Sequence, residues 1–183
     1  GTFTTAEGEE QAAEFMHSEE WAYLEGEGFT GFMKYYEGGD YAFAALLPEE
    51  GSSPAELISS LNGAELRALL ASPQDVNVDT ALPKFESGSS LELSETLEAM
   101  GMADAFDPEF SDFSALGQSA MGNIYINRVL HETFISVDEK GTEAGAAPAV
   151  EMVGEGAPAE MRIVRLDRPF AYMIVDTATG VPL

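Results

Sequence analysis

Apolar and polar positions change register along the chain in a way that predicts short strands and a few short helices. Residues 29–47 contain two aromatic-rich apolar runs around the turn Glu37-Gly38-Gly39-Asp40, and this arrangement predicts a β-hairpin that ends at Pro48. Further strands are predicted where apolar or β-branched residues alternate or follow one another, at residues 76–82, 124–137, 161–166 and 170–175. Residues 1–20 give a weak signal, which fits either a short strand or a helical turn around Phe15.

Helices are predicted at three places. Ser53 can cap a helix that starts at Pro54, and Glu56 completes a capping box. A second short helix is predicted over residues 65–70, and a third over residues 90–100, with Gly101 as its C-cap. Residues 104–117 are predicted to form an irregular acidic and aromatic loop. The mixture of elements, rich in strands and without an internal repeat, predicts the α+β class.

Composition limits the classes of function. The 183 residues, 45% of them hydrophobic, suffice for one large domain or two small ones with a real core. The 8 basic and 33 acidic residues give a net charge of -25, which argues against nucleic acid and an anionic membrane surface as partners. The absence of cysteine excludes disulfides, thiol nucleophiles and thiolate metal sites. No transmembrane helix or signal peptide is predicted, and both chain ends look like cuts through a longer protein.

Catalytic chemistry receives little support from the side chains. A Ser-His-Asp triad would need His17 or His131 as its base, but no nucleophile-elbow sequence occurs, and a structural histidine is the favoured interpretation. Acidic residues gather at Asp104, Asp107, Glu109 and Asp112, a group that could form a calcium loop or a glycosidase carboxylate pair, but their spacing does not fit the EF-hand pattern. Because 33 acids produce such groups by chance, a solvated acidic surface is the favoured interpretation. No cofactor and no metal are predicted.

One segment departs from ordinary composition. After the strand that ends near Val137, residues 141–159 consist of glycine, alanine, proline, glutamate and a few small apolar residues. The simplest interpretation is a flexible linker. A row of small residues can also lie out as an exposed loop or be threaded between packed strands, where larger side chains would clash.

The stretch Val137-Asp138-Glu139-Lys140-Gly141-Thr142-Glu143-Ala144 resembles the hinge of the reactive loop of the serpins, a family of serine protease inhibitors. Other matches follow the order of the family's sequence: Ala81-Leu82-Pro83-Lys84-Phe85, Met100-Gly101-Met102 with Asp104-Ala105-Phe106, Asp112-Phe113-Ser114, Val129-Leu130-His131-Glu132-Thr133, Arg168-Pro169-Phe170 and Gly180-Val181-Pro182-Leu183. The resemblance covers residues 1–183 as the C-terminal half of a serpin domain of bacterial type, without the N-terminal half or the last strand.

The resemblance implies a serpin fold with mixed and antiparallel sheets, a few short helices and an exposed reactive-centre loop at about residues 139–160. It implies a protease inhibitor rather than an enzyme. A serine protease, or a cysteine protease, attacks the loop, which then inserts as a new strand of the central sheet and traps the acyl-enzyme. The implied hinge residues are Glu139, Gly141, Thr142, Glu143, Ala144, Gly145, Ala146 and Ala147, and the implied scissile region is Glu155, Gly156, Ala157 and Pro158. The implied partners are a target protease and the missing N-terminal half, and the implied location is extracellular or at the cell surface.

The resemblance also gives two structural residues and one departure. Lys84 and Glu139 are expected to lie close together at the point where the loop enters the sheet, and His131 is expected to be a buried structural histidine with an incomplete set of partners. Pro148 stands where inhibitors of the family usually have threonine or another small residue, and proline lacks the N–H that a central strand needs. A non-inhibitory substrate or binding protein with the same fold therefore stays open. An acidic hydrolase is the weaker alternative.

Overall fold

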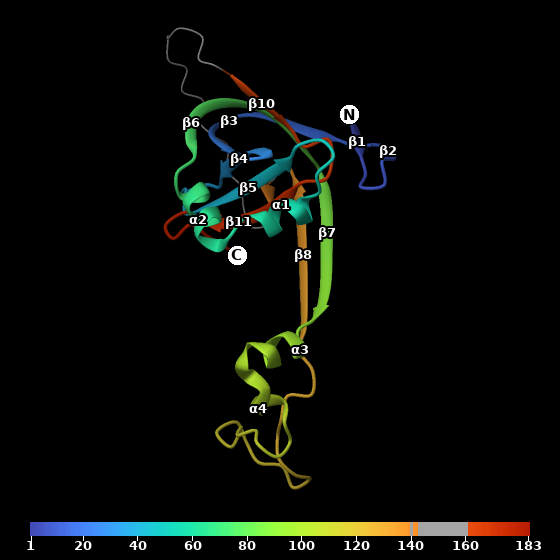
Figure 1. The fold of residues 1–183 in the computed structure, drawn as a ribbon, viewed down its shortest axis with the longest axis vertical. Coiled ribbons are helices and arrows are strands. Elements are labelled where there is room, and N and C mark those ends of the chain that lie inside the picture. Colours follow the sequence, from blue (N-terminus) through green and yellow to red (C-terminus); the bar gives the residue numbers. More distant parts are fainter. Residues whose placement is uncertain (140, 143–160) are drawn as a thin grey trace. The chain divides into compact units, whose positions relative to one another are not determined.

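The computed structural model describes residues 1–139, 141–142 and 161–183 (Figure 1). The chain forms two compact units. Unit 1 contains Gly1–Phe85 and Ser136–Leu183, and unit 2 contains Glu86–Ile135. No helix of the described residues is long and apolar enough to cross a membrane.

A seven-stranded sheet dominates unit 1. Its strands lie in the order β10 (Arg162–Arg165), β6 (Gln74–Pro83), β3 (Phe15–Gly26), β4 (Phe29–Tyr35), β5 (Tyr41–Pro48), β11 (Ala171–Asp176) and β12 (Val181–Pro182). Neighbouring strands are antiparallel, except that β10 runs parallel to β6. A separate hairpin of β1 (Thr2–Thr4) and β2 (Glu10–Ala12) precedes the sheet. The strands predicted at residues 76–82, 161–166 and 170–175 are therefore confirmed.

The predicted β-hairpin is the pair β4–β5. Its turn places Gly38 and Gly39 at φ values of 85° and 75°, a left-handed conformation that glycine adopts without a steric penalty. Inside the hairpin, Gly31 packs directly against the neighbouring strand, since a Cβ built on it would lie 2.2 Å from the carbonyl oxygen of Ala45. The close approach of these two strands therefore depends on the missing side chain of Gly31.

The hydrophobic core of unit 1 lies between this sheet and two short helices, α1 (Pro54–Ser60) and α2 (Gly63–Ala71) (Figure 1). Leu57 of α1 and Leu70 of α2 join a buried cluster with the strand residues Ala22, Leu24, Phe29, Met33, Ala42, Ala44, Leu46 and Val175. Each large aliphatic or aromatic side chain buried in this way contributes roughly 1.5–3 kcal/mol relative to an exposed one.

Both helices begin at the caps that the sequence supplies. The Ser53 side chain accepts from the backbone N–H of Glu56, whose carboxylate accepts in return from the Ser53 N–H, so the predicted capping box is present. Asn62 forms an equivalent box with Glu65 and thereby starts α2, two residues earlier than predicted, at Gly63.

Unit 2 differs most from the prediction. Strand β7 (Phe85–Glu92), whose first residue belongs to unit 1, pairs with β8 (Leu130–Asp138) in a sheet ordered β7-β8-β9, where β9 is Gly141–Thr142. The helix predicted over residues 90–100 is wrong in its extent, because the chain stays extended to Glu92. Helix α3 (Ser94–Leu97) then leads into a π-helical turn, η1 (Glu98–Met102), and α4 (Ala103–Phe106). Gly101, at φ 107°, interrupts this helical run inside η1 rather than capping a single helix.

The strand predicted from residue 124 also begins later, at Leu130. Residues 124–129 bind with their backbone to the helical part of unit 2 instead of joining the sheet. The N–H of Ile126 donates to the carbonyl of Ala105 at 2.9 Å, and the N–H of Val129 donates to the Ser94 hydroxyl at 3.0 Å. These partners replace the ladder hydrogen bonds that a longer strand would need.

Candidate functional site

The candidate site lies directly after β8, at the first of the residues for which the resemblance implied a hinge. The side chain of Lys84, directly after β6, forms ion pairs with Glu139, directly after β8, and with Glu14, directly before β3. The Lys84 Nζ lies 2.8 Å from Glu14 Oε2, and the backbone N–H of Lys84 donates to the carbonyl of Glu14 at 2.8 Å. The proximity of Lys84 and Glu139, predicted through the serpin resemblance, is therefore confirmed.

Local structure explains why these three residues meet. Pro83 is the last residue of β6, and β6 pairs with β3 so that Pro83 lies opposite Phe15. This register places Lys84 beside Glu14. The last residues of β8, from Ser136 onward, belong to unit 1 together with Lys84. Glu139 directly follows them and reaches the Lys84 side chain.

The charges of the site come from one cation, Lys84, and two anions, Glu14 and Glu139. Hydrogen bonds from the Lys84 ammonium to Glu139 and then to Glu14 raise the pKa of Lys84 above its ordinary value of 10.5. The side chains of Lys84, Glu14 and Glu139 keep 30%, 79% and 63% of their surface exposed, so water and salt screen the attraction. The two ion pairs of Lys84 can hold Glu139 in place, but the free energy needed to separate the partners is small.

The hinge residues Gly141 and Thr142 form β9, antiparallel to the end of β8. Thr142 lies opposite Val137, and Gly141 lies opposite Asp138. This pairing of Gly141 and Thr142 with the end of β8 was not predicted from the sequence. The remaining predicted loop residues lie outside the described residues: Glu143, Ala144, Gly145, Ala146, Ala147, Pro148, Glu155, Gly156, Ala157 and Pro158.

The expectation for His131 is wrong in one respect. Its side chain is exposed rather than buried, as are all residues from Leu130 to Phe134, because the described chain packs against neither face of this part of β8. The expected incomplete set of partners is found, since the imidazole makes no hydrogen bond or ion pair within the described residues. His17 is exposed as well, and neither histidine contacts a serine hydroxyl in the described part of the chain.

Two of the four acidic residues between 104 and 112, Asp107 and Asp112, cap backbone turns. Asp107 Oδ1 accepts from the N–H of Glu109 at 2.7 Å and from the N–H of Phe110 at 3.3 Å. Asp112 accepts from both the hydroxyl and the N–H of Ser114, and these bonds lower the pKa of Asp112 below its ordinary value of 3.8. Within the described residues there is no group of three or more histidine or acidic side chains that could hold a metal ion.

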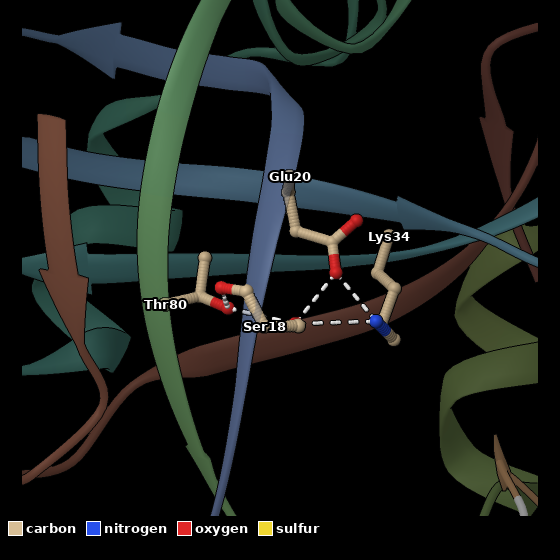
Figure 2. Close-up of polar contacts among 4 residues, drawn as sticks. All are labelled: Ser18, Glu20, Lys34 and Thr80. Atoms are coloured by element: carbon tan, nitrogen blue, oxygen red, sulfur yellow. Dashed lines mark hydrogen bonds and ion pairs between the residues drawn. The ribbon is translucent and has the colours of Figure 1, made fainter. Parts of the chain in front are cut away.

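A polar cluster around Ser18 was missed by sequence reasoning (Figure 2). The Ser18 hydroxyl donates to Glu20 at 2.7 Å and accepts from the Lys34 ammonium at 3.2 Å, while Lys34 also pairs with Glu20. Thr80, 1% exposed, donates to the Ser18 carbonyl at 2.9 Å. Ser18 and Glu20 are two residues apart on β3, but only the register with β6 and β4 shows which side chains join them.

The Ser18 cluster lacks the arrangement of a serine nucleophile. Activation by lysine requires a neutral amine as general base. The Lys34 side chain instead forms an ion pair with the Glu20 carboxylate. The Ser18 hydroxyl proton is directed toward Glu20 Oε1, which also accepts from the Lys34 ammonium. The cluster therefore satisfies polar groups at the junction of β3, β4 and β6.

Comparison with known proteins assigns the fold. The family model for serpins, described as serine protease inhibitors, matches residues 1–183. An uncharacterised serpin-like protein of Thermococcus kodakarensis is 36% identical over 168 residues, covering 90% of this chain and 38% of the relative. Serpin B10 of Otolemur garnettii is 33% identical over 159 residues, covering 82% of this chain and 38% of the relative. The native state of the thermophilic serpin tengpin is 44% identical with a TM-score of 0.84, covering 100% of this chain and 47% of that one.

The chain therefore belongs to the serpin family, with the α+β fold of a serpin's C-terminal half. It spans less than half the length of the relatives it matches. Serpin homologues are protease inhibitors in general and not enzymes, and target proteases are the kind of partner that they have.

Proposed function

We propose that the protein containing this chain is a serpin-type inhibitor that uses residues 139–160 as bait for a serine protease or a cysteine protease. The observation that carries the proposal is the ion pair between Lys84 and Glu139, which holds the residue directly after β8 beside the end of β6. A bait loop needs such an anchor, because its near end must stay in register with the sheet that it later enters.

The proposed reaction begins at the protease. Its serine oxygen or cysteine sulfur attacks the carbonyl carbon of the bait bond, the C–N bond breaks, and the new amine leaves with a proton. The cut loop then inserts as a strand before water can release the acyl group. Residues Thr142, Ala144 and Ala146 alternate along the sequence, and a strand would place them on one face. Their small size suits entry between packed strands.

The bait bond is proposed within residues 155–159. Counting from the hinge leads to Glu155-Gly156, and counting back from Pro169 leads near Pro158-Ala159. A glutamate before the cut suits a glutamate-specific protease. We propose further that the protein acts outside the cell or at the cell surface, and that the remaining half of the serpin fold completes the sheet.

A second candidate function is that of a substrate or binding protein that does not inhibit. Pro148 favours it, because a proline in the inserting strand removes one ladder hydrogen bond and slows insertion. An acidic hydrolase has no support beyond the number of carboxylates.

The experiment is a protease panel applied to the full-length protein. An inhibitor gives a covalent complex that resists detergent, whereas a substrate is only cleaved. Thr142→Arg places a bulky cation on the face that must be buried and should convert trapping into cleavage. Glu143→Arg is the matched control, since alternation directs this side chain to the opposite face. Cleavage of the wild type without any complex, by every protease, would contradict inhibition.

A further inference from the structure

The ammonium group of Lys84 is shared between two carboxylates that come from different parts of the chain. Glu14 belongs to the segment that enters β3, and it is tied to Lys84 twice, through its backbone carbonyl at 2.8 Å and through its side chain at 2.8 Å. Glu139 directly follows β8. The Lys84–Glu14 pair therefore continues the pairing of β6 with β3 by one residue on each strand, while Glu139 belongs to the segment that follows β8.

Two like charges on one cation weaken each other's attraction. At the position of Glu139, the field of the Lys84 ammonium is opposed by the negative charge of Glu14, which contacts the same nitrogen. When Glu139 leaves, Lys84 keeps a carboxylate partner in Glu14 and is not left as an unpaired cation. Both effects lower the free-energy difference between a closed state, in which Glu139 contacts Lys84, and an open state, in which this contact is broken.

We propose that Glu14 is a competing partner of Lys84 that sets how readily Glu139, and with it the start of the loop, is released. The consequence for insertion rests on the inhibitory function proposed above, but the release itself does not. It is a local opening of the end of β8 that occurs in the uncleaved protein.

The test compares hinge opening in the full-length protein with and without the charge of Glu14. Hydrogen exchange of the backbone amides of residues 136–139 is followed by mass spectrometry, because their exchange rate reports the population of the open state. Glu14→Gln should slow exchange about two- to five-fold, which is the range that exposed ion pairs supply. Glu27→Gln is the matched control, since it removes the same charge from the exposed residue at the opposite end of β3.

Two further measurements define the mechanism. At about 1 M salt, where the Debye length is about 3 Å, the difference between Glu14→Gln and the wild type should shrink. In a Lys84→Met background, Glu14→Gln should slow exchange less than it does in the wild type, because the shared cation is gone and only the direct repulsion between the two carboxylates is relieved.

Three outcomes would overturn the proposal. Faster exchange in Glu14→Gln would mean that Glu14 positions the ammonium for Glu139 instead of competing with it. Unchanged exchange would mean that the hold on Glu139 does not depend on Glu14. An equal effect of Glu27→Gln would mean that only net charge matters. Because no protease is present, each of these results is distinct from a failure to trap a protease.

Discussion

Lys84 and Glu139 form an ion pair that joins the end of β6 to the end of β8. Residues 136–139 lie in the same compact unit as Lys84, whereas the preceding part of β8 belongs to the other unit. The pair thus ties the residue that follows β8 to the residue that follows β6 within unit 1.

Reversing the charge of Lys84 should break its ion pair with Glu139 and loosen the end of β8. Lys84→Glu in the full-length protein puts three acidic side chains together and should speed cleavage after Val137 by a protease of broad specificity. The double variant Lys84→Glu with Glu139→Lys should restore resistance in part, since Glu14 would still repel the glutamate introduced at position 84. Mass spectrometry of the fragments checks the cleavage site. A double variant as labile as the single one would contradict a direct pairing.

Gly31 offers a sharp test of the β4–β5 interface. Gly31→Ala places a Cβ only 2.2 Å from the carbonyl oxygen of Ala45, so the strands must separate. Overpacking of this kind destabilises by about 1–3 kcal/mol. Gly63→Ala is the matched control, because its Cβ meets nothing within 4 Å at the start of α2, and it should stabilise by about 0.4–1 kcal/mol. Urea unfolding of both variants gives the two values, and equal effects would argue against the close approach.

Asp176 should contribute to the pH dependence of stability. Its carboxylate accepts from the N–H of Thr179 at 2.9 Å and from the Thr179 hydroxyl at 3.0 Å, and these bonds lower the pKa of Asp176 below 3.8. A lowered folded-state pKa gives stability that is present above the unfolded-state value and is lost as the pH falls through the folded-state value.

The measurement is the free energy of unfolding between about pH 5 and about pH 2, the range in which a lowered carboxyl pKa acts. Asp176→Asn should be less stable than the wild type at the upper end, and the two curves should converge at the lower end. Thr179→Val removes the hydroxyl donor but not the N–H, so its loss should be intermediate. Parallel curves for wild type and Asp176→Asn would show that the turn does not depend on the charge.

Short-range chemistry explains which parts of the fold can be predicted from the sequence. The turn at Gly38-Gly39 and the capping box of Ser53 with Glu56 depend on neighbouring residues only, and both are present. Strand β7 was not predicted, because Glu86-Ser87-Gly88-Ser89-Ser90 carries no apolar alternation. This segment becomes a strand through its pairing with β8, as the ladder supplies backbone hydrogen bonds that the local sequence does not indicate.

The candidate site depends on contacts between distant segments. Nothing local in the sequence indicates that Lys84 meets Glu139, and only the serpin resemblance predicted it. Glu14 was missed because its contact depends on the register of β3 with β6. The cluster of Ser18, Glu20, Lys34 and Thr80 was missed for the same reason, since it needs three strands in register beside the irregularity in β3 that follows Glu20.

Replacing Pro148 with threonine in the full-length protein should improve inhibition. Trapping requires insertion to outrun deacylation, and a residue without an N–H leaves a buried carbonyl of the neighbouring strand unpaired, which costs roughly 1–3 kcal/mol. Applied to the insertion barrier, this amounts to about one to two decades in rate, since about 1.4 kcal/mol is tenfold. The stoichiometry of inhibition, the number of inhibitor molecules consumed for each protease trapped, should therefore fall toward one in Pro148→Thr. Ala149→Thr is the matched control, because it adds the same side chain without restoring an N–H. An unchanged stoichiometry would show that insertion stops before residue 148 or that the sheet tolerates proline there, and cleavage of both proteins without complex would favour the non-inhibitory function.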